Sequence, residues 1–204
     1  MRTLKTKVCG LRDEENVMQV AALKPDYIGF IFYEKSARYA GHGDLAFLNE
    51  LSGTKKVAVF VNATEKEIDS VLTRYSFDAV QLHGNERPEF CETVRQKNVE
   101  LIKAFGVDSG FDFNQLEVYR SVVDYFLFDT KTSLHGGSGR QFDWSILDGY
   151  KENTPYFLSG GIDKATFQSA TSLQDERLYC IDVNSRFELE PGIKSIPLLK
   201  TILK

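Results

Sequence analysis

The sequence predicts an α/β protein, a (βα)8 TIM barrel that forms as a single domain over residues 1–204. Short apolar runs recur along the whole chain, and segments with helical patterns lie between them. A chain of 204 residues can bury one substantial core and is short for two. The main alternative, an open doubly wound sheet, often carries G-x-G-x-x-G after its first strand, and that motif is missing here.

Eight apolar runs are expected to form the strands. Each is short, almost continuously apolar and rich in Val, Ile, Phe or Tyr, and most are followed by Gly, Asp, Asn or His. Continuous apolarity is typical of parallel strands that helices cover. In chain order, the runs are Thr6–Cys9, Tyr27–Phe32, Val57–Val61, Ala79–Leu82, Leu101–Ala104, Tyr125–Phe128, Tyr156–Leu158 and Tyr179–Val183.

The segments between these runs carry helix signals. Thr64 and Glu67 have the spacing of a capping box and precede apolar residues at helical intervals. Residues 16–23 place their apolar side chains on one stripe, and Pro88 suits the first turn of a further helix. A last helix is expected over residues 195–203, which keep three apolar residues on one face.

Composition and charge exclude several classes of function. The net charge is −4 and Lys and Arg are spread along the chain, so we expect no nucleic-acid partner. No apolar run is long enough to span a membrane, and the N-terminus lacks the apolar stretch of a signal peptide, so we expect a cytoplasmic protein without a membrane partner. Cys9, Cys91 and Cys180 lie far apart and outside any Cys/His cluster, which fits a reducing compartment and predicts no metal site.

Polar and titratable residues are concentrated where the predicted strands end, and in a (βα)8 barrel these ends carry the catalytic groups. They include Cys9, His83 and Asp129. Lys7 should share the barrel-interior face with Cys9, where a cation would favour the thiolate. Gln81 and His83 alternate with apolar neighbours and should face the barrel mouth, either to line a substrate pocket or to satisfy buried polar groups. This concentration favours an enzyme over an inert scaffold.

The loops after the seventh and eighth strands predict a phosphate site. Gly160 and Gly161 let the backbone approach an anion closely, although they can equally serve a tight turn. Asn184 and Ser185 add small donors opposite, and this second loop favours phosphate binding. A third glycine-rich stretch, residues 135–139, follows the sixth strand and is interpreted as an active-site lid rather than a plain connection.

Strand-end segments along essentially the whole chain also form an ordered pattern. They are Lys7–Gly10, Gly29–Tyr33 with Ser36–Tyr39, Val59–Asn62, Val80–Gly84, Phe128–Lys131, Gly136–Gly139 with Phe142–Trp144, Leu158–Ile162 and Glu190–Lys194. Together they resemble the phosphoribosylanthranilate isomerase family of tryptophan biosynthesis. Any one segment is weak support, but eight in order are strong.

The resemblance implies an Amadori rearrangement of phosphoribosylanthranilate to 1-(2-carboxyphenylamino)-1-deoxyribulose 5-phosphate, without a cofactor. It puts the general base, which takes the proton from the sugar C2, at Cys9 and the general acid for the ring oxygen at Asp129. An acid at Asp129 requires a raised pKa. Arg38 is the expected partner of the anthranilate carboxylate. Lys7, Gln81 and His83 are the other expected substrate-binding residues, and we expect a monomer or a homodimer.

One departure concerns the loop after the eighth strand. Many members of the family carry Ser-Ser-Gly there, whereas this chain has Asn184, Ser185 and Arg186. Either Arg186 contacts the phosphate, or it points outward and leaves Ser185 as the remaining donor.

Two alternatives to this function stay open. One is another phosphate-binding barrel, such as a different sugar-phosphate isomerase or indole-glycerol-phosphate synthase, whose lysine and carboxylate pattern is not found. The other is a non-catalytic barrel, against which the presence of both Cys9 and Asp129 argues.

Overall fold

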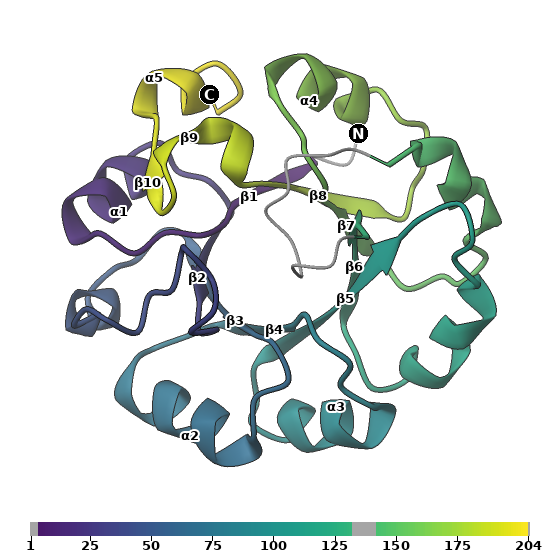
Figure 1. The fold of residues 1–204 in the computed structure, drawn as a ribbon, viewed down its shortest axis with the longest axis horizontal. Helices are drawn as coiled ribbons and strands as arrows, with labels where there is room; N and C mark the ends of the chain where they lie inside the picture. The colour runs from purple at the N-terminus through teal and green to yellow at the C-terminus, as the bar shows by residue number, and fades with distance from the viewer. Residues whose placement is uncertain (1–3, 132–141, 204) are drawn as a thin grey trace.

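A closed barrel of eight parallel strands forms the centre of the protein in the computed structural model, which describes residues 4–131 and 142–203 (Figure 1). Each strand is hydrogen-bonded to the next along the chain, and the last pairs with the first, Val8 lying opposite Val183. The predicted barrel is therefore confirmed, and the open sheet is excluded. The strands are β1 (Lys5–Val8), β2 (Tyr27–Ile31), β3 (Lys55–Phe60), β4 (Ala79–Leu82), β5 (Glu100–Val107), β6 (Tyr125–Thr130), β7 (Tyr156–Leu158) and β8 (Leu178–Val183).

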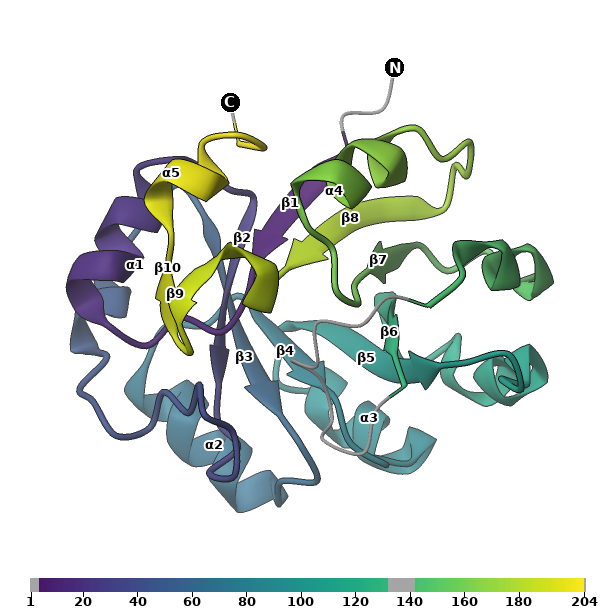
Figure 2. The ribbon, with the colours of Figure 1, turned by 45° about the horizontal axis from the view of Figure 1, so that its top comes forward.

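Helices surround the barrel, and several connections are short 3-10 helices rather than the α-helices of a regular (βα)8 unit (Figure 1). The α-helices are α1 (Glu14–Ala21), α2 (Glu65–Arg74), α3 (Pro88–Arg95), α4 (Lys164–Thr171) and α5 (Ile196–Leu199). The 3-10 helices are η1 (Ala46–Asn49), η2 (Phe113–Tyr119), η3 (Trp144–Gly149) and η4 (Ser185–Phe187). After η4, the short antiparallel strands β9 (Glu188–Glu190) and β10 (Ile193–Lys194) precede α5 and lie beside α1 (Figure 2).

Local signals explain where several helices begin and end. The capping box at α2 is confirmed, since the Glu67 amide donates to Thr64 Oγ1 at 3.3 Å and the Thr64 amide donates to Glu67 Oε2 at 2.7 Å. Pro88 is the first residue of α3, as expected. The last helix is shorter than predicted, because α5 ends at Leu199 and the chain then tightens, with the Ile202 amide donating to the Leu199 carbonyl.

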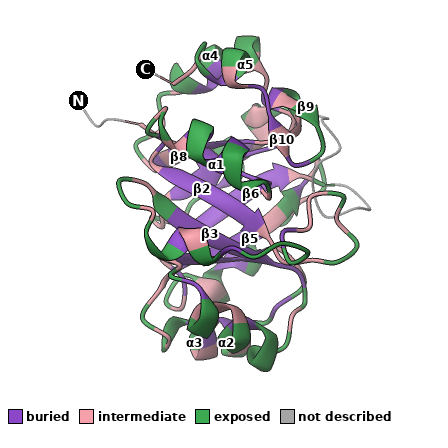
Figure 3. Ribbon diagram, turned by 90° about the vertical axis from the view of Figure 1, so that its left-hand side faces the viewer, coloured by how far each residue is buried: buried purple, intermediate pink, exposed green. Residues whose placement is uncertain are grey.

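Burial follows the two faces of the barrel wall. The strands are buried, and the helices expose their outer faces (Figure 3). One apolar cluster fills the layer between strands and helices. A second cluster fills the barrel interior and consists of Cys9, Tyr27, Val57, Val59, Ala79, Ile102, Ala104, Leu127, Phe157 and Cys180. Alternation along each strand thus directs every second side chain inward, so that the residues at the strand ends converge on one barrel mouth.

Candidate active site

Cys9 follows β1 directly, and its thiol is buried inside the barrel with 4% of the residue exposed. The Cys9 amide donates to the Val183 carbonyl at 2.9 Å, which ties this residue to the end of β8. Gly29 on β2 leaves the space that the thiol occupies: a Cβ at position 29 would lie 2.8 Å from Cys9 Sγ. The sequence offered one signal for this role of Gly29. A glycine inside an apolar strand often marks a place where another group approaches the backbone closely.

The Lys7 ammonium lies fully buried beside Cys9. Its Nζ donates to Gln81 Oε1 at 2.8 Å and to Asp182 Oδ2 at 2.9 Å. Burial is the largest influence on the Lys7 pKa and acts to lower it, but Asp182 and Cys9 together raise the pKa above its usual value. Lys7 is therefore a buried cation with fixed partners.

The pKa of the Cys9 thiol is raised overall, although Lys7 acts on it in the expected direction. Burial is the main cause and Asp182 adds to it, whereas Lys7 lowers the pKa as expected but does not outweigh them. The physical reason is that the buried thiol has lost its hydration, and the Asp182 carboxylate that pairs with Lys7 offsets part of the favourable charge of Lys7. The resting thiol is protonated at neutral pH.

Asp182 is a buried carboxyl group that was not among the predicted site residues. Its Oδ1 has no hydrogen-bond partner among the described residues, although it is buried. Burial raises the pKa of Asp182, and the Lys7 cation opposes that rise. An unpaired buried acceptor of this kind is costly unless a ligand or water supplies a donor.

Asp129 is the second-last residue of β6, and it has the raised pKa that a general acid requires. Burial raises its pKa to about 7, although the Thr130 amide, which donates to Asp129 Oδ1 at 2.8 Å, opposes the shift. Gly160 lies against this strand end, since a Cβ there would lie 2.4 Å from Thr130 Oγ1. His83 Nε2 lies 3.5 Å from Asp129 Oδ2.

Gln81 and His83 connect the Lys7 side of the barrel mouth to the Asp129 side. Gln81 Nε2 lies 3.0 Å from His83 Nδ1, and Gln81 Oε1 accepts from Lys7. Gln81 is buried, with 1% of the residue exposed. Both side chains lie at the end of β4, so alternation along one strand places them on the same interior face.

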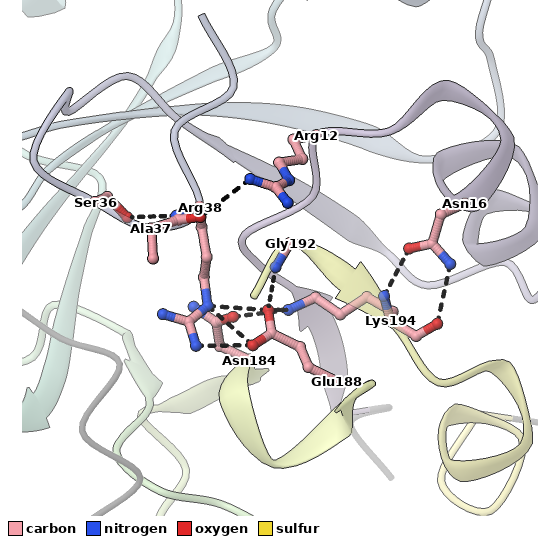
Figure 4. Close-up of polar contacts among 9 residues, drawn as sticks. All are labelled: Arg12, Asn16, Ser36, Ala37, Arg38, Asn184, Glu188, Gly192 and Lys194. Carbon is pink, nitrogen blue, oxygen red and sulfur yellow. Dashed lines mark hydrogen bonds and ion pairs between the residues drawn. The ribbon is translucent and has the colours of Figure 1, made fainter. Parts of the chain in front are cut away.

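Arg38 belongs to a second charged cluster, between the loop after β2 and the segment after β8 (Figure 4). Its Nε donates to Glu188 Oε1 at 2.9 Å and its Nη2 donates to Glu188 Oε2 at 2.7 Å. Lys194 Nζ donates to the same carboxylate and to Asn184 Oδ1, both at 2.7 Å. Arg38 Nη1 makes no hydrogen bond to another described residue, so this side of the guanidinium can take a second carboxylate.

Burial and the neighbouring charges shift the pKa values of Glu188 and Lys194 in this cluster. Burial raises the pKa of Glu188, but Arg38 and Lys194 outweigh it and hold the pKa below its usual value. Burial lowers the pKa of Lys194 to about 8, against the opposing effect of Glu188. Glu188 is therefore a permanent anion that orients Arg38.

Gly160 and Gly161 form the turn from β7 towards α4, with φ angles of +99° and +62°. Positive φ favours glycine, so the tight turn by itself requires these residues. Their amides donate no hydrogen bond to another described residue and remain available to an anion. On the opposite loop, Asn184 is engaged by Lys194, and Ser185 begins η4.

A family model described as N-(5'phosphoribosyl)anthranilate (PRA) isomerase matches residues 6–204. The chain belongs to this family. It is 46% identical over 201 residues to the N-(5'-phosphoribosyl)anthranilate isomerase of Parabacteroides distasonis, covering 97% of this chain and 91% of that protein. It is 36% identical over 197 residues to the isomerase of Phocaeicola vulgatus, covering 97% of this chain and 95% of that protein.

Solved structures of the family have the same fold. The phosphoribosyl anthranilate isomerase of Thermotoga maritima superposes with a TM-score of 0.86 at 34% identity, covering 99% of this chain and 98% of that chain. A phosphoribosyl anthranilate isomerase in complex with reduced 1-(o-carboxyphenylamino)-1-deoxyribulose 5-phosphate superposes with a TM-score of 0.83 at 31% identity, covering 99% and 97%. The family is thus one of isomerases built on this barrel.

Arg186, where the resemblance leads to the expectation of a glycine, is exposed on η4. Hydrogen bonds from Thr166 are the main cause that lowers the pKa of Asp163, and the charge of Arg186 contributes to the shift. Asp163 is the N-cap of α4, which follows the Gly160–Gly161 turn.

The predicted lid, residues 135–139, lies outside the described residues. Within residues 4–131 and 142–203, no group of three or more His, Cys, Asp or Glu side chains is arranged to hold a metal ion. No helix in this same part of the chain has the length and apolarity needed to cross a membrane.

Proposed function

We propose that this chain converts N-(5'-phosphoribosyl)anthranilate into 1-(2-carboxyphenylamino)-1-deoxyribulose 5-phosphate, a step of tryptophan biosynthesis, without a cofactor. The observation that carries the proposal is a pair of buried groups at one barrel mouth. They are the Cys9 thiol after β1 and the Asp129 carboxyl group, whose pKa is about 7. Family membership supports the substrate, as does the reduced product analogue bound to a related isomerase. The cytoplasmic location expected from the sequence stays a prediction.

Asp129 serves as the general acid that opens the ribosyl ring. Because its pKa is about 7, a large fraction of Asp129 is protonated at neutral pH and can still release the proton readily. The proton goes to the ring oxygen as the bond between C1 and this oxygen breaks, and the nitrogen lone pair forms a protonated imine at C1. The Thr130 amide then stabilises the carboxylate that remains.

Cys9 serves as the general base for the second step. Its thiolate takes the proton from C2, and the C–H electron pair forms the C1–C2 double bond and neutralises the imine. The resulting enolamine becomes the ketone by tautomerisation. The thiol is protonated at rest, so Cys9 acts in the fraction of molecules in which the thiol has released its proton to solvent while Asp129 keeps its own. The positive charge of Lys7 favours this ionisation, and the protonated imine stabilises the thiolate further once it forms.

The remaining residues hold the two ends of the substrate. Arg38 binds the anthranilate carboxylate through the side of the guanidinium that Glu188 leaves unused. The phosphate binds to the amides of Gly160 and Gly161, with Asn184 and Ser185 on the opposite loop. Lys7, Gln81 and His83 line the ribosyl part of the pocket between these ends.

The decisive experiment measures turnover of phosphoribosylanthranilate made in the cuvette from anthranilate and phosphoribosyl pyrophosphate. We expect the substrate fluorescence to disappear and the product mass to appear in proportion to enzyme concentration. A Cys9→Ala, Asp129→Ala double variant, purified in the same way, controls for contaminating host enzyme and for spontaneous hydrolysis. No turnover above this control at high enzyme concentration would exclude the function.

A further inference from the structure

Four polar side chains form a continuous row across the barrel mouth, from the end of β1 to the end of β6. Lys7 Nζ lies 2.8 Å from Gln81 Oε1, Gln81 Nε2 lies 3.0 Å from His83 Nδ1, and His83 Nε2 lies 3.5 Å from Asp129 Oδ2. Asp182 anchors the row at its first end by accepting from Lys7 at 2.9 Å. The row thus connects the buried cation beside the thiol to the acid.

The chemistry of Lys7 fixes the direction of every hydrogen bond in this row. An ammonium only donates, so the Gln81 atom that faces Lys7 must be the carbonyl oxygen. The Gln81 amide nitrogen then faces His83 Nδ1, and because this nitrogen also only donates, Nδ1 must accept. A neutral imidazole whose Nδ1 accepts carries its proton on Nε2. The N–H of His83 therefore points at Asp129.

We propose that Gln81 is a positioning residue that fixes His83 as the Nε2–H tautomer, and that His83 in this form stabilises the Asp129 carboxylate left after proton transfer. The tautomer follows from the row itself, whereas its catalytic meaning rests on the proposed function. The contact of 3.5 Å is long for a strong hydrogen bond, and such contacts often shorten when substrate binds.

The opposite tautomer would work against the acid. With the proton on Nδ1, the Nε2 lone pair would face Asp129, repel the carboxylate and compete with the substrate oxygen for the acidic proton. The Gln81 amide group would then also face a second donor. One glutamine, oriented by a buried lysine, thus prevents both effects.

The ring nitrogens of His83 can be observed directly in the resting protein. The chain contains three histidines, and the resonances that disappear in His83→Asn belong to His83. In a 15N-resolved spectrum of the full chain at neutral pH, we expect an unprotonated Nδ1 and a protonated Nε2. A protonated Nδ1, whether in the other tautomer or in an imidazolium, would overturn the proposal, and this measurement requires no activity.

Gln81→Glu tests whether Gln81 fixes the tautomer of His83. A carboxylate accepts from both Lys7 and His83 and so requires a proton on His83 Nδ1. We expect the His83 spectrum to show this proton and kcat to fall by at least about tenfold. Gln81→Met, which keeps the length of the side chain and removes both hydrogen bonds, is the matched control and should give a mixture of tautomers.

The outcomes separate the two parts of the proposal. An unchanged His83 spectrum in Gln81→Glu would show that Gln81 does not set the tautomer. A changed spectrum with unaltered kcat would remove the catalytic role while leaving the isomerase function intact. If wild-type protein shows the Nε2–H tautomer but no turnover, the proposed function fails and the tautomer assignment stands.

Discussion

Glu188 binds the Arg38 guanidinium through Nε and Nη2, with the Nη2–Oε2 distance at 2.7 Å. The Arg38 side chain is 13% exposed and the Glu188 side chain 5%, so this pair is held in a largely buried site. A carboxylate of the chain itself thus occupies one side of the arginine that was expected to bind the substrate carboxylate. The pair orients the side of the guanidinium that Glu188 does not contact. Arg38 can therefore bind a substrate carboxylate while it stays paired with Glu188.

This geometry predicts that Arg38→Lys weakens substrate binding although it keeps the charge. A lysine cannot contact Glu188 and a second carboxylate in one plane, so we expect KM to rise about tenfold, with a smaller change in kcat. Arg12→Lys is the matched control, because Arg12 is a partly exposed neighbour that donates to the Ala37 carbonyl. Steady-state kinetics that give equal KM values for the two variants would remove Arg38 from the substrate site.

The proposed catalytic groups, Cys9 and Asp129, predict an unusual pH profile for kcat/KM. The pKa of Asp129 is about 7 and that of Cys9 lies above the ordinary thiol value, so the acid ionises at lower pH than the base. The active form holds one proton between them, on Asp129. We therefore expect kcat/KM to rise up to about pH 7, remain level, and fall above the raised pKa of Cys9. A profile that falls near neutral pH would contradict this arrangement.

The cysteines provide an internal comparison for the base. Cys9→Ser should lower kcat by about 10²–10⁴-fold, because a serine hydroxyl ionises far less readily than a thiol. Cys180→Ser is the matched control, since Cys180 belongs to the same buried cluster inside the barrel but lies within β8 rather than at a strand end. Equal losses of kcat in the two variants would indicate a packing effect rather than a chemical role for Cys9.

Local patterns in the sequence were sufficient to predict the strands and the two residues of the site that lie at strand ends. Apolar runs located all eight strands, and the positions of Cys9 and Asp129 at strand ends followed from them. Strand limits were less certain: β5 continues to Val107, beyond the predicted end at Ala104, because its last residues pair with β6. The pattern of residues within β5 holds no information on its pairing with β6, so it could not predict this extension.

The supporting residues of the site could not be predicted for the same reason. Asp182 matters because β8 closes the barrel against β1 and brings its carboxylate to Lys7. Glu188 matters because the segment after β8 folds back to Arg38, 150 residues away in the sequence. These contacts depend on closure of the barrel, whereas the sequence pattern records only which residues alternate within one strand.

Gly29 leaves room for the Cys9 thiol, because it has no side chain of its own. A Cβ at this position would lie 2.8 Å from Cys9 Sγ, closer than atoms in a packed interior tolerate, and at a tight 3.3 Å from Lys7 Cε. We expect Gly29→Ala to displace the thiol, lower kcat by at least about tenfold and lower the free energy of unfolding by about 1–3 kcal/mol. Gly43→Ala is the matched control, because a Cβ there meets nothing within 4 Å. Kinetics and urea denaturation of both variants test this, and wild-type kcat in Gly29→Ala would show that the thiol position is not critical.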